Sequence, residues 1–550
     1  MKNQLVIAEK PSVGMSLAAV LGARDRKDGY VEGNGYIVSW CVGHLVGLAD
    51  AYEYAEKYGK WKREDLPIIP GDMTGQTGGA DAWKYIVFDG KQKQFNILRG
   101  LMNRADVTSL VGATDAGREG ELIFRFVYHM ANCKKPFTRL WISSMEESAI
   151  KKGFAEMKDG SEYDPLYYSA LCRAKADWLI GINATRLFST LYNKTLNVGR
   201  VQTPTLAMLT ERQNKISGFV KEKYHVVRLD INAGSADGTG NTGGATSIDG
   251  AGRGGTITAK SPHITDPQEA RNIQAAADKQ AAVCVSLTKE QKSIAPPKLF
   301  DLTALQRECN RLFGYTAQET LNAAQKLYEL KLITYPRTDS KYLTSDMAAG
   351  LPALVQTSIE FLAAPIIVGV NTGQVVNDSK VSDHHAIIPT AEVGKKDTTK
   401  LSDTERNILA LIAITLVCAV ANKHVYEAVT AVFDCNGYSF TAKGKTVISD
   451  GWKEFYPGNN NANSSKHNNS TNNDHGGDND SGTLPSITEG QTFTDTAATV
   501  TEHYTQPPSP FTEDTLLLAM ENAGAEETTG EAERRGLVTP ATRAAVCRRH

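Results

Sequence analysis

Paired cysteines are missing from this 550-residue sequence, although it contains eight cysteines. They are spread singly along the chain, and no two have the CxxC spacing of a zinc ribbon or a redox motif. A disulfide framework and a cluster of thiolate metal ligands are therefore excluded as organising features. Single, scattered cysteines are typical of a reducing compartment, so we expect a cytoplasmic protein.

Long hydrophobic runs are missing as well. The longest, Ile408 to Ala421, has about 14 residues, whereas a helix needs about 20 to cross a bilayer. At the N-terminus a carboxylate, Glu9, and a proline, Pro11, come before the apolar core of a signal peptide could form. The sequence thus predicts a soluble, intracellular protein that does not contact a membrane.

Neither sign of charge is in excess, because 60 lysines and arginines accompany 62 aspartates and glutamates, a net charge of −2. This balance excludes a uniformly basic nucleic-acid coat. It does not exclude a local basic channel, since affinity for nucleic acid follows clustered phosphate contacts. The hydrophobic fraction of 41% is enough for several cores, and the chain length predicts about three to five domains.

Several nucleotide and metal motifs are absent. Gly444-Lys445-Thr446 resembles the end of a Walker A loop, but Ser439 stands where the first glycine is required. The sequence has no HExxH zinc motif, and no GxGxxG follows an apolar strand. These absences exclude a P-loop ATPase and a zincin-type protease.

The N-terminal part of the sequence alternates between strand and helix patterns. Residues 5–8 predict a short apolar strand, and a helical pattern follows with Ser12 as its expected N-cap and Gly22 as its expected end. Val107 to Ala113 predicts a second strand, and a glycine-rich turn after it leads into an apolar helix. Strand–turn–helix units with acids at the strand ends are typical of α/β sheets that build a site there.

Beyond residue 150 the pattern changes several times, which predicts a multidomain protein of α/β plus separate α and β parts. Residues 257–295 look extended, and the β-rich parts on either side of a helical block suggest one domain interrupted by another. The predicted units are an α/β domain at 1–150, a helical part at 151–215, a β-rich part at 216–297 with a Gly-rich insertion at 233–255, a helical block at 298–424, a β-rich part at 425–505 with a low-complexity, disordered insertion at 457–482, and a final part at 506–550.

Three acids lie at the ends of the two predicted N-terminal strands. Glu9 comes just after the first strand, and Asp115 and Glu119 come just after the second, in a segment with two glycines. Brought together, these carboxylates would make an all-oxygen site that suits Mg²⁺. For Glu9 alone, a solvated surface acid is the plainer interpretation; for Asp115 and Glu119 the glycines favour a close approach to phosphate.

A tyrosine and an arginine flank a proline in the segment Leu332 to Ser340. Pro336 fixes the backbone, so Tyr335 and Arg337 keep a set relation to each other. A phenol beside a guanidinium suits attack on a phosphodiester, because arginine stabilises charge on phosphate oxygens. The alternative is a tyrosine at a helix end that packs on its neighbouring proline, and the segment alone does not decide between them.

Two further polar segments are candidates for phosphate contacts. Residues 197–205 combine glycine, arginine, glutamine and threonine on a turn before a helix, where backbone amides suit a phosphate track, although an ordinary helix entry is equally consistent. His384 and His385 are adjacent, but no third nitrogen or thiolate accompanies them, so a hydrogen-bonding role is favoured over a metal site.

Taken together, these segments resemble the type IA DNA topoisomerases, specifically the branch of bacterial DNA topoisomerase III. The resemblance rests on several independent motifs that occur in the family's order over nearly the whole chain. They are Ile7–Ser12, Val42–Leu45, Ala113–Leu122, Arg173–Arg186, Val198–Pro204, Ile333–Ser340, Asp383–Pro389 and Gly536–Arg543.

The resemblance implies an N-terminal Toprim domain followed by three domains that close a toroid around DNA. By similarity, Tyr335 is the nucleophile that forms a 5′-phosphotyrosyl intermediate and leaves a free 3′ hydroxyl. Arg337 would hold the scissile phosphate, Lys10 would stabilise charge or protonate the leaving oxygen, and Glu9 and Asp115 would bind Mg²⁺. Because the ester keeps the energy of the broken bond, resealing should need no ATP.

The same resemblance implies a path for single-stranded DNA and a set of partners. We expect negatively supercoiled or catenated DNA as the substrate, a helicase or single-strand-binding protein as a possible partner, and a monomer that acts in the cytoplasm near the nucleoid. The residues expected to line the DNA path or support the site are His44, Arg173, Gly181, Asn197, Val198, Gly199, Arg200, Val201, Gln202, Arg337 and His384.

The sequence departs from the family pattern in two places. Many type IA enzymes have three alternating acids in the second Toprim motif, and here Gly117 occupies the middle position, which makes Glu119 the expected third acid. The chain also ends in an abruptly basic segment soon after Arg543, so a truncated product that only binds DNA is the main alternative. A Toprim primase or nuclease needs no tyrosine nucleophile, and a tyrosine recombinase would need an Arg/His cluster around Tyr335 that is not evident.

Overall fold

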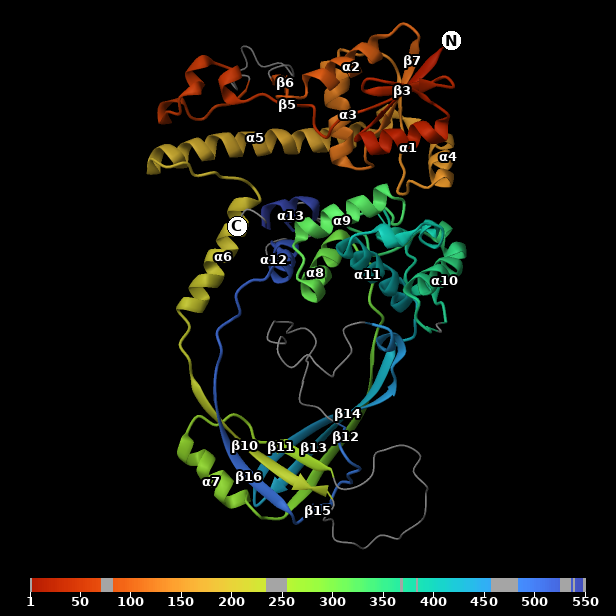
Figure 1. The fold of residues 1–550 in the computed structure, drawn as a ribbon. Coiled ribbons are helices and arrows are strands. Elements are labelled where there is room, and N and C mark those ends of the chain that lie inside the picture. The colour runs from red at the N-terminus through yellow and green to blue at the C-terminus, as the bar shows by residue number, and fades with distance from the viewer. Residues whose placement is uncertain are drawn as a thin grey trace.

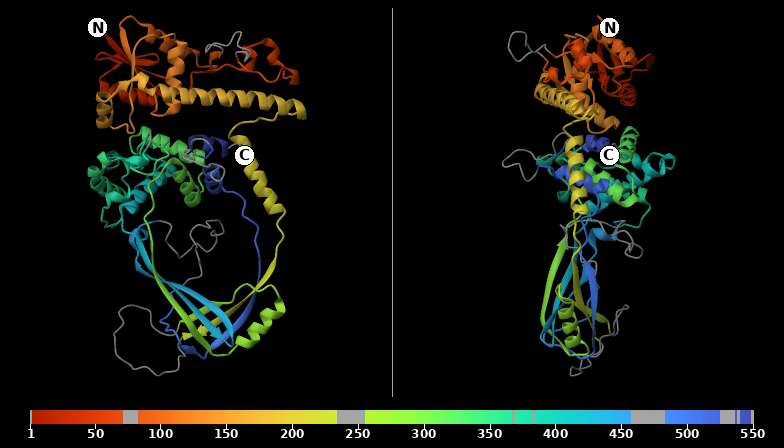
Figure 2. Two further views of the ribbon diagram at one scale, coloured as in Figure 1. Left: turned by 180° about the vertical axis from the view of Figure 1, so that it is seen from behind. Right: turned by 90° about the vertical axis from the view of Figure 1, so that its left-hand side faces the viewer.

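The computed structural model describes residues 2–70, 83–233, 255–366, 369–381, 384–456, 483–524, 536–537 and 540–547. Nearly all of the predicted Gly-rich insertion and the whole predicted disordered insertion lie outside these residues. The described chain has the overall shape of a ring (Figure 1). An α/β unit lies at one end, helices lie beside it, and segments of the chain run down both sides of the ring to a second sheet at the other end (Figure 2).

A mixed sheet forms the N-terminal unit, in the order β2-β3-β4-β1-β7-β8-β9, with parallel pairing among its central strands β4, β1, β7 and β8 and antiparallel pairing at both edges. β1 is the centre because its Leu-Val-Ile-Ala segment is fully buried, with alternate side chains in the cores on its two faces. The strands are β1 (Asn3–Ala8), β2 (Asp25–Lys27), β3 (Tyr30–Gly33), β4 (Tyr36–Trp40), β7 (Val107–Ala113), β8 (Phe137–Arg139) and β9 (Lys158–Asp159).

Four helices cover this sheet: α1 (Pro11–Leu21), α2 (Gln92–Asn103), α3 (Arg118–Met130) and α4 (Glu147–Ala155). Gly22 ends α1 in the left-handed conformation, with φ of 79°, as predicted. The predicted N-cap was wrong. Pro11 takes the first helical position and Lys10 precedes it, so Ser12 already lies inside the helix.

The connection from this unit to the rest of the ring is helical. α5 (Asp164–Tyr192) has 29 residues and runs along the side of the α/β unit, and α6 (Gln202–Ser217) turns away from it toward the second sheet (Figure 1). A two-stranded antiparallel ladder of β5 (Val46–Leu48) and β6 (Tyr85–Val87) lies next to α5. None of the helices in the described parts of the chain is both long and apolar enough to span a membrane.

The second sheet is antiparallel, in the order β15-β12-β13-β14-β11-β10-β16. Its strands come from both sides of the helical block in sequence. They are β10 (Lys223–Asn232), β11 (Thr256–Lys260), β12 (Ala282–Ile294), β13 (His424–Cys435), β14 (Tyr438–Ser449), β15 (Thr492–Phe493) and β16 (Thr496–Tyr504).

Residues 257–295 are not extended throughout, as the sequence pattern had suggested. They contain α7 (Pro267–Ala277), which begins at a proline and is capped by the Asp266 side chain. Ala270, Ile273 and Ala277 form its buried face against the sheet. This helical spacing is hard to detect in the sequence because the segment is short and contains many alanines.

The remaining helices pack beneath the α/β unit. They are α8 (Leu302–Phe313), α9 (Ala317–Glu329), α10 (Leu351–Leu362), α11 (Asp403–Ala419), α12 (Glu513–Asn522) and α13 (Pro540–Cys547). A capping box of Thr316 and Glu319 begins α9. One apolar core joins this block to the α/β unit, because Val6 and Ile150 share it with Leu327 and Ile387. The segment after α9 is thereby placed against the strand ends of the first sheet.

Candidate active site

The site begins at the carboxyl ends of two neighbouring parallel strands. Ala8 of β1 and Ala113 of β7 are register partners, so the residues that follow them, Glu9 and Asp115, emerge at the same edge. The Asp115 backbone N–H donates to a carboxylate oxygen of Glu9 over 3.3 Å. Glu9 is only 5% exposed. The prediction that the two acids lie together is thus confirmed by their geometry.

Tyr335 reaches this edge from the helical block. Its hydroxyl donates to the Asp115 carboxylate over 3.0 Å, and its backbone N–H donates to the Ser143 carbonyl over 3.0 Å. The side chain is 6% exposed and belongs to the shared core. Two segments that lie 220 positions apart in sequence therefore place a phenol directly on an acid of the first sheet.

Burial and neighbouring charges shift the pKa values of several groups in the site. Burial and the neighbouring Asp115 carboxylate raise the pKa of Glu9 to about 7, although Arg337 and Lys10 oppose that shift. Burial and Asp115 also hold the pKa of Tyr335 well above its usual value. Burial disfavours the charge on Arg337, but Tyr335, Asp115 and Glu9 outweigh it and raise its pKa. The phenol is thus protonated, beside a permanent cation.

His384 packs on the other side of the tyrosine. The ring centroids of His384 and Tyr335 are 4.4 Å apart. Nε2 of His384 bonds to the carbonyl of Ala116, which can only accept, so Nε2 carries the proton and Nδ1 accepts from the Ser143 hydroxyl over 2.8 Å. Burial lowers the pKa of His384 to about 4, which keeps the ring neutral. Ser143 thus holds both the Tyr335 backbone and the His384 side chain.

These groups open into a cavity of about 390 Å³ between the α/β unit and the helical block. Nine of the residues predicted from the sequence line it: Glu9, Lys10, His44, Asp115, Glu119, Arg173, Tyr335, Arg337 and His384. Burial lowers the pKa of His44, while the nearby Glu119 carboxylate opposes that shift. The lining of the cavity therefore combines cations, acids and one phenol.

The remaining predicted residues lie along α5, outside this cavity. Gly181, Asn197, Val198 and Gln202 line a separate hollow of about 360 Å³ together with Asp177 and Trp178. Arg200 lies beside it, in a 2.7 Å ion pair with Asp177. The backbone of Gly199 and Val201 takes part in the entry to α6, where Gly199 N–H donates to Thr203 Oγ1 and the Val201 carbonyl accepts from Thr205. The predicted set is thus divided between two places.

The expected cluster of three acids is not assembled. In the described part of the chain, no group of three or more His, Cys, Asp or Glu side chains is placed to hold a metal ion. Glu119 lies in the first turn of α3 and lines the same cavity as Glu9 and Asp115, which follow strands. Two carboxylates at a cavity still fit Mg²⁺, which commonly takes one or two carboxylates and completes its shell with water and substrate phosphate.

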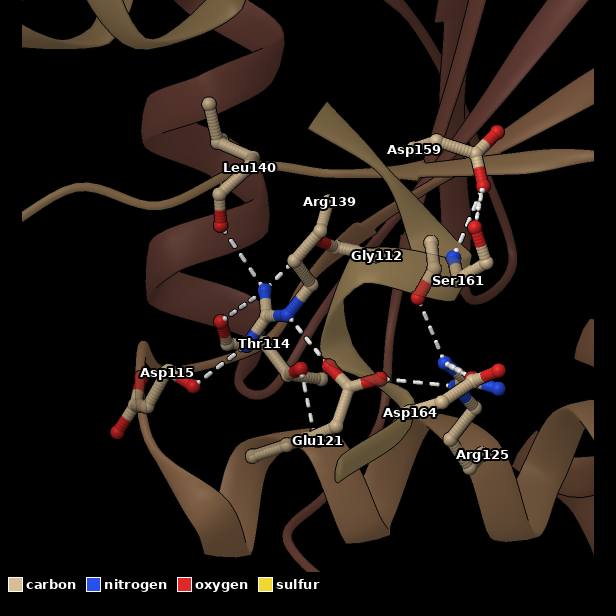
Figure 3. Close-up of polar contacts among 12 residues, drawn as sticks. Gly112, Thr114, Asp115, Glu121, Arg125, Arg139, Leu140, Asp159, Ser161 and Asp164 are labelled. Carbon is tan, nitrogen blue, oxygen red and sulfur yellow. Dashed lines mark hydrogen bonds and ion pairs between the residues drawn. The ribbon is translucent and has the colours of Figure 1, made fainter. Parts of the chain in front are cut away.

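A buried network that the sequence analysis missed supports the acidic loop (Figure 3). Arg139, at the end of β8, is fully buried and donates from Nε to Glu121 over 2.8 Å. Its two terminal nitrogens donate to four carbonyls, those of Gly112, Thr114, Leu140 and Asp115, over 2.7–2.9 Å. One guanidinium thus satisfies the backbone of the loop that carries Asp115.

The network continues to the start of α5. Arg125 donates to the other oxygen of Glu121 over 2.8 Å, to the Gly160 carbonyl over 2.8 Å and to Asp164 over 2.7 Å (Figure 3). Asp164 is the first residue of α5. The sequence signal for this network was Glu121 and Arg125, two opposite charges four residues apart in a mainly apolar helical segment. Charged side chains are rarely buried unless they are paired.

Comparison with known proteins identifies the family. The model of the bacterial-type DNA topoisomerase family, described as DNA topoisomerase, matches residues 161–549, and the Toprim domain model matches residues 4–145. The chain is also 40% identical over 560 residues to DNA topoisomerase 3 of Bacillus subtilis (strain 168), covering 99% of this chain and 71% of that protein. The chain belongs to the type IA DNA topoisomerases.

Other comparisons agree with this assignment. DNA topoisomerase 3 of Bacillus licheniformis is 40% identical over 565 residues, which cover 99% of this chain and 71% of the relative. Full-length topoisomerase I from Thermotoga maritima has the same fold, with a TM-score of 0.68 at 20% identity over 99% of this chain and 77% of that one. The predicted Toprim domain and type IA fold class of this topoisomerase are confirmed.

Proposed function

We propose that this topoisomerase breaks a DNA strand with Tyr335 and reseals it through the reverse reaction. The hydroxyl oxygen of Tyr335 attacks a backbone phosphorus, the bond between that phosphorus and the 3′ oxygen breaks, and the 5′ phosphate stays on the tyrosine as an ester. The observation that carries this proposal is the 3.0 Å contact from the Tyr335 hydroxyl to Asp115 at the mouth of the cavity. That contact gives the phenolic proton an acceptor.

The cations of the cavity support the other steps. Arg337 is next to the nucleophile and suits bidentate binding of the scissile phosphate. Lys10 lines the same cavity, so it is our candidate for protonating the leaving 3′ oxygen and for accepting that proton back during resealing. Because the ester retains the energy of the broken bond, we propose that the cycle requires no ATP.

We further propose that Glu9 and Asp115 hold Mg²⁺. Bound there, the cation would neutralise charge on the phosphate and on the two acids, which otherwise repel each other. His384 and Ser143 keep the tyrosine ring and backbone in place. Glu119, with Arg173 and His44, lies on the cavity wall where the neighbouring nucleotides would pass.

The wider role follows from the same family. We propose that the enzyme binds single-stranded regions along Gly181, residues 197–202 and the cavity, and passes a second strand through the break. Negatively supercoiled or catenated DNA would be the substrate, handled by a monomer in the cytoplasm near the nucleoid, with a helicase or single-strand-binding protein as a partner. The support is the resemblance together with the hollow along α5 that these residues line.

Cleavage of an end-labelled single-stranded oligonucleotide tests the central step. We expect a covalent protein–DNA adduct on a denaturing gel with Mg²⁺, far less adduct with EDTA, and none with Tyr335→Phe, which keeps the buried ring. Binding of the same oligonucleotide should change by less than about twofold in Tyr335→Phe. Binding without any adduct from the unmodified chain would instead support the alternative of a DNA-binding remnant.

A further inference from the structure

The second sheet carries a basic hollow at the end of the ring opposite the active site. Its volume is about 880 Å³, and it spans four adjacent strands, β14, β11, β10 and β16. Figure 1 places these strands at the far end of the ring from β1 and β7. Nothing in the proposed cleavage reaction uses this surface.

The hollow lies on the face of the sheet that α7 leaves uncovered. Along β10, Val227, Leu229 and Ile231 belong to the core under α7, whereas Val226 and Arg228 line the hollow. The same alternation holds in β14, where Phe440 is buried in that core. Because successive side chains of a strand point to opposite faces of the sheet, every second residue of these strands lies on the face with the hollow.

The ionisable side chains that line the hollow are all basic. The thirteen described residues that line the hollow include five basic side chains, Arg228, Lys260, Lys443, His263 and His503, and no carboxylate. Arg228 and Lys260 are direct register partners on adjacent antiparallel strands. Asp230 offsets part of the charge through a 2.8 Å bond from Arg228.

Three aromatic rings stack at the edge of the same hollow. The ring of Tyr224 lies 4.2 Å from that of His263 at an angle of 25°, and 5.4 Å from that of His503 at 20°. Thr258, Thr441, Thr501 and Ser439, which carry hydroxyls, also line the hollow. Cations for phosphates next to flat rings for bases are the combination by which proteins hold single-stranded nucleic acid.

We infer that this hollow, made of Tyr224, Arg228, Lys260, His263, Lys443 and His503, is a second binding site for single-stranded DNA. The phosphates would contact Arg228, Lys260 and Lys443, and an unpaired base would stack beside Tyr224 and its histidines. Single-stranded rather than duplex DNA is favoured because bases inside a duplex are stacked on each other and cannot reach the rings. The site would hold a strand at the far end of the ring while the active site holds another.

Photocross-linking of the full chain tests this inference directly. A single-stranded oligonucleotide with 5-iodouracil is irradiated on the protein, and mass spectrometry identifies the linked peptides. We expect links at Tyr224, His263 or His503, in addition to links near the active site. Excess unlabelled single strand should remove them, whereas a blunt duplex of the same length should compete far less.

Charge reversal adds a matched control. The double variant Lys260→Glu with Lys443→Glu should lower the links at the sheet by about tenfold, because two phosphate contacts become repulsive. Lys289→Glu makes the same change at an exposed position of β12 outside the hollow and should leave them unchanged. Both proteins should form the Tyr335 adduct normally, since the active site lies at the other end of the ring.

Three results would overturn the inference. They are the absence of links at the three rings in the unmodified chain, equal loss of links in the control and the double variant, and equal competition by the duplex. The first needs no variant, so it holds even if the double variant folds poorly. None of them bears on the adduct at Tyr335, so failure of this site and failure of the proposed cleavage are separately visible.

Discussion

Ser143 occupies the junction between the two halves of the active site. Its carbonyl accepts from the backbone of Tyr335, and its hydroxyl donates to Nδ1 of His384. The imidazole is thereby held between that hydroxyl and the Ala116 carbonyl, in the tautomer with the proton on Nε2. Because the same ring packs on Tyr335, a change at Ser143 should reach the nucleophile through His384.

Ser143→Ala is expected to slow cleavage without weakening DNA binding. Loss of the hydroxyl removes one hydrogen bond, about 1 kcal/mol of stability, and lets the His384 ring turn or change tautomer. We expect the rate of adduct formation to fall by about tenfold and the ¹⁵N spectrum of His384 to show mixed tautomers.

Ser144→Ala is the matched control for this variant. Among the described residues, its hydroxyl accepts a hydrogen bond from the backbone N–H of Glu146, over 3.2 Å, and forms no hydrogen bond with His384. An unchanged His384 spectrum in Ser143→Ala, or an equal loss of rate in both variants, would contradict a positioning role for Ser143.

At the level of elements, one buried network joins the ends of β7 and β8, the helix α3 and the start of α5. Arg139 binds the loop after β7, and Arg125 binds the first residue of α5 through the shared partner Glu121. α5 also carries Arg173 on the cavity wall. The acidic loop and the helix along which DNA is proposed to lie therefore have a common support.

Arg139→Lys tests whether Arg139 positions the loop that carries Asp115 or only stabilises the fold. Lysine keeps the charge but lacks the planar fork that reaches four carbonyls, so the loop with Asp115 should lose its fixed position. We expect cleavage to fall by about 10- to 100-fold, more Mg²⁺ to be needed for half-maximal adduct, and oligonucleotide binding to stay within about twofold.

Arg125→Lys offers the comparison, because Arg125 also pairs with Glu121 but does not touch the loop after β7. Both variants should unfold at lower denaturant concentration, since each weakens a buried ion pair. Only Arg139→Lys should change the Mg²⁺ requirement. If both variants changed the Mg²⁺ requirement equally, Arg139 would only stabilise the fold and would not position the acidic loop.

The elements also show what could be predicted from the sequence. Parallel strands with acids after their last residues are enough to place Glu9 beside Asp115, and the strand period is enough to expect one face of β10 in a core. α7 was missed because a segment rich in alanine has a weak helical period between two strands. The third acid, Glu119, lies in the first turn of α3 and lines the same cavity as the other two acids, and its role as a metal ligand stays a prediction.

For the whole molecule, the ring is closed at the active site by contacts between the α/β unit and the helical block. These include the bonds to Tyr335 and His384, the shared apolar core and an exposed ion pair of 3.7 Å between Lys152 and Asp346. No spacing in the sequence could predict this closure, because Tyr335 and Asp115 are 220 residues apart. Only the resemblance to a family placed them in one site, and the predicted domain boundaries stay predictions.

If strands pass through the ring at this closure, locking it should separate cleavage from relaxation. Lys152→Cys with Asp346→Cys, joined by a short bismaleimide, should still form the Tyr335 adduct with a short oligonucleotide. Relaxation of a negatively supercoiled plasmid should fall by at least about tenfold, because the two halves can no longer part. Each single variant treated with the reagent controls for modification of Cys172, which is exposed.

Full relaxation by the cross-linked protein would show that strands do not pass at this closure. Loss of the oligonucleotide adduct would show instead that the cross-link distorts the site. Only retained cleavage with lost relaxation agrees with passage through the active-site end of the ring.

The most direct test of the account is the chemical identity of the covalent link. The adduct formed with a single-stranded oligonucleotide in Mg²⁺ is digested with protease and nuclease, and its peptide is sequenced by mass spectrometry. The account predicts one nucleotide attached through its 5′ phosphate to Tyr335, with a free 3′ hydroxyl on the released fragment. A link through a 3′ phosphate, or to any residue other than Tyr335, would contradict it.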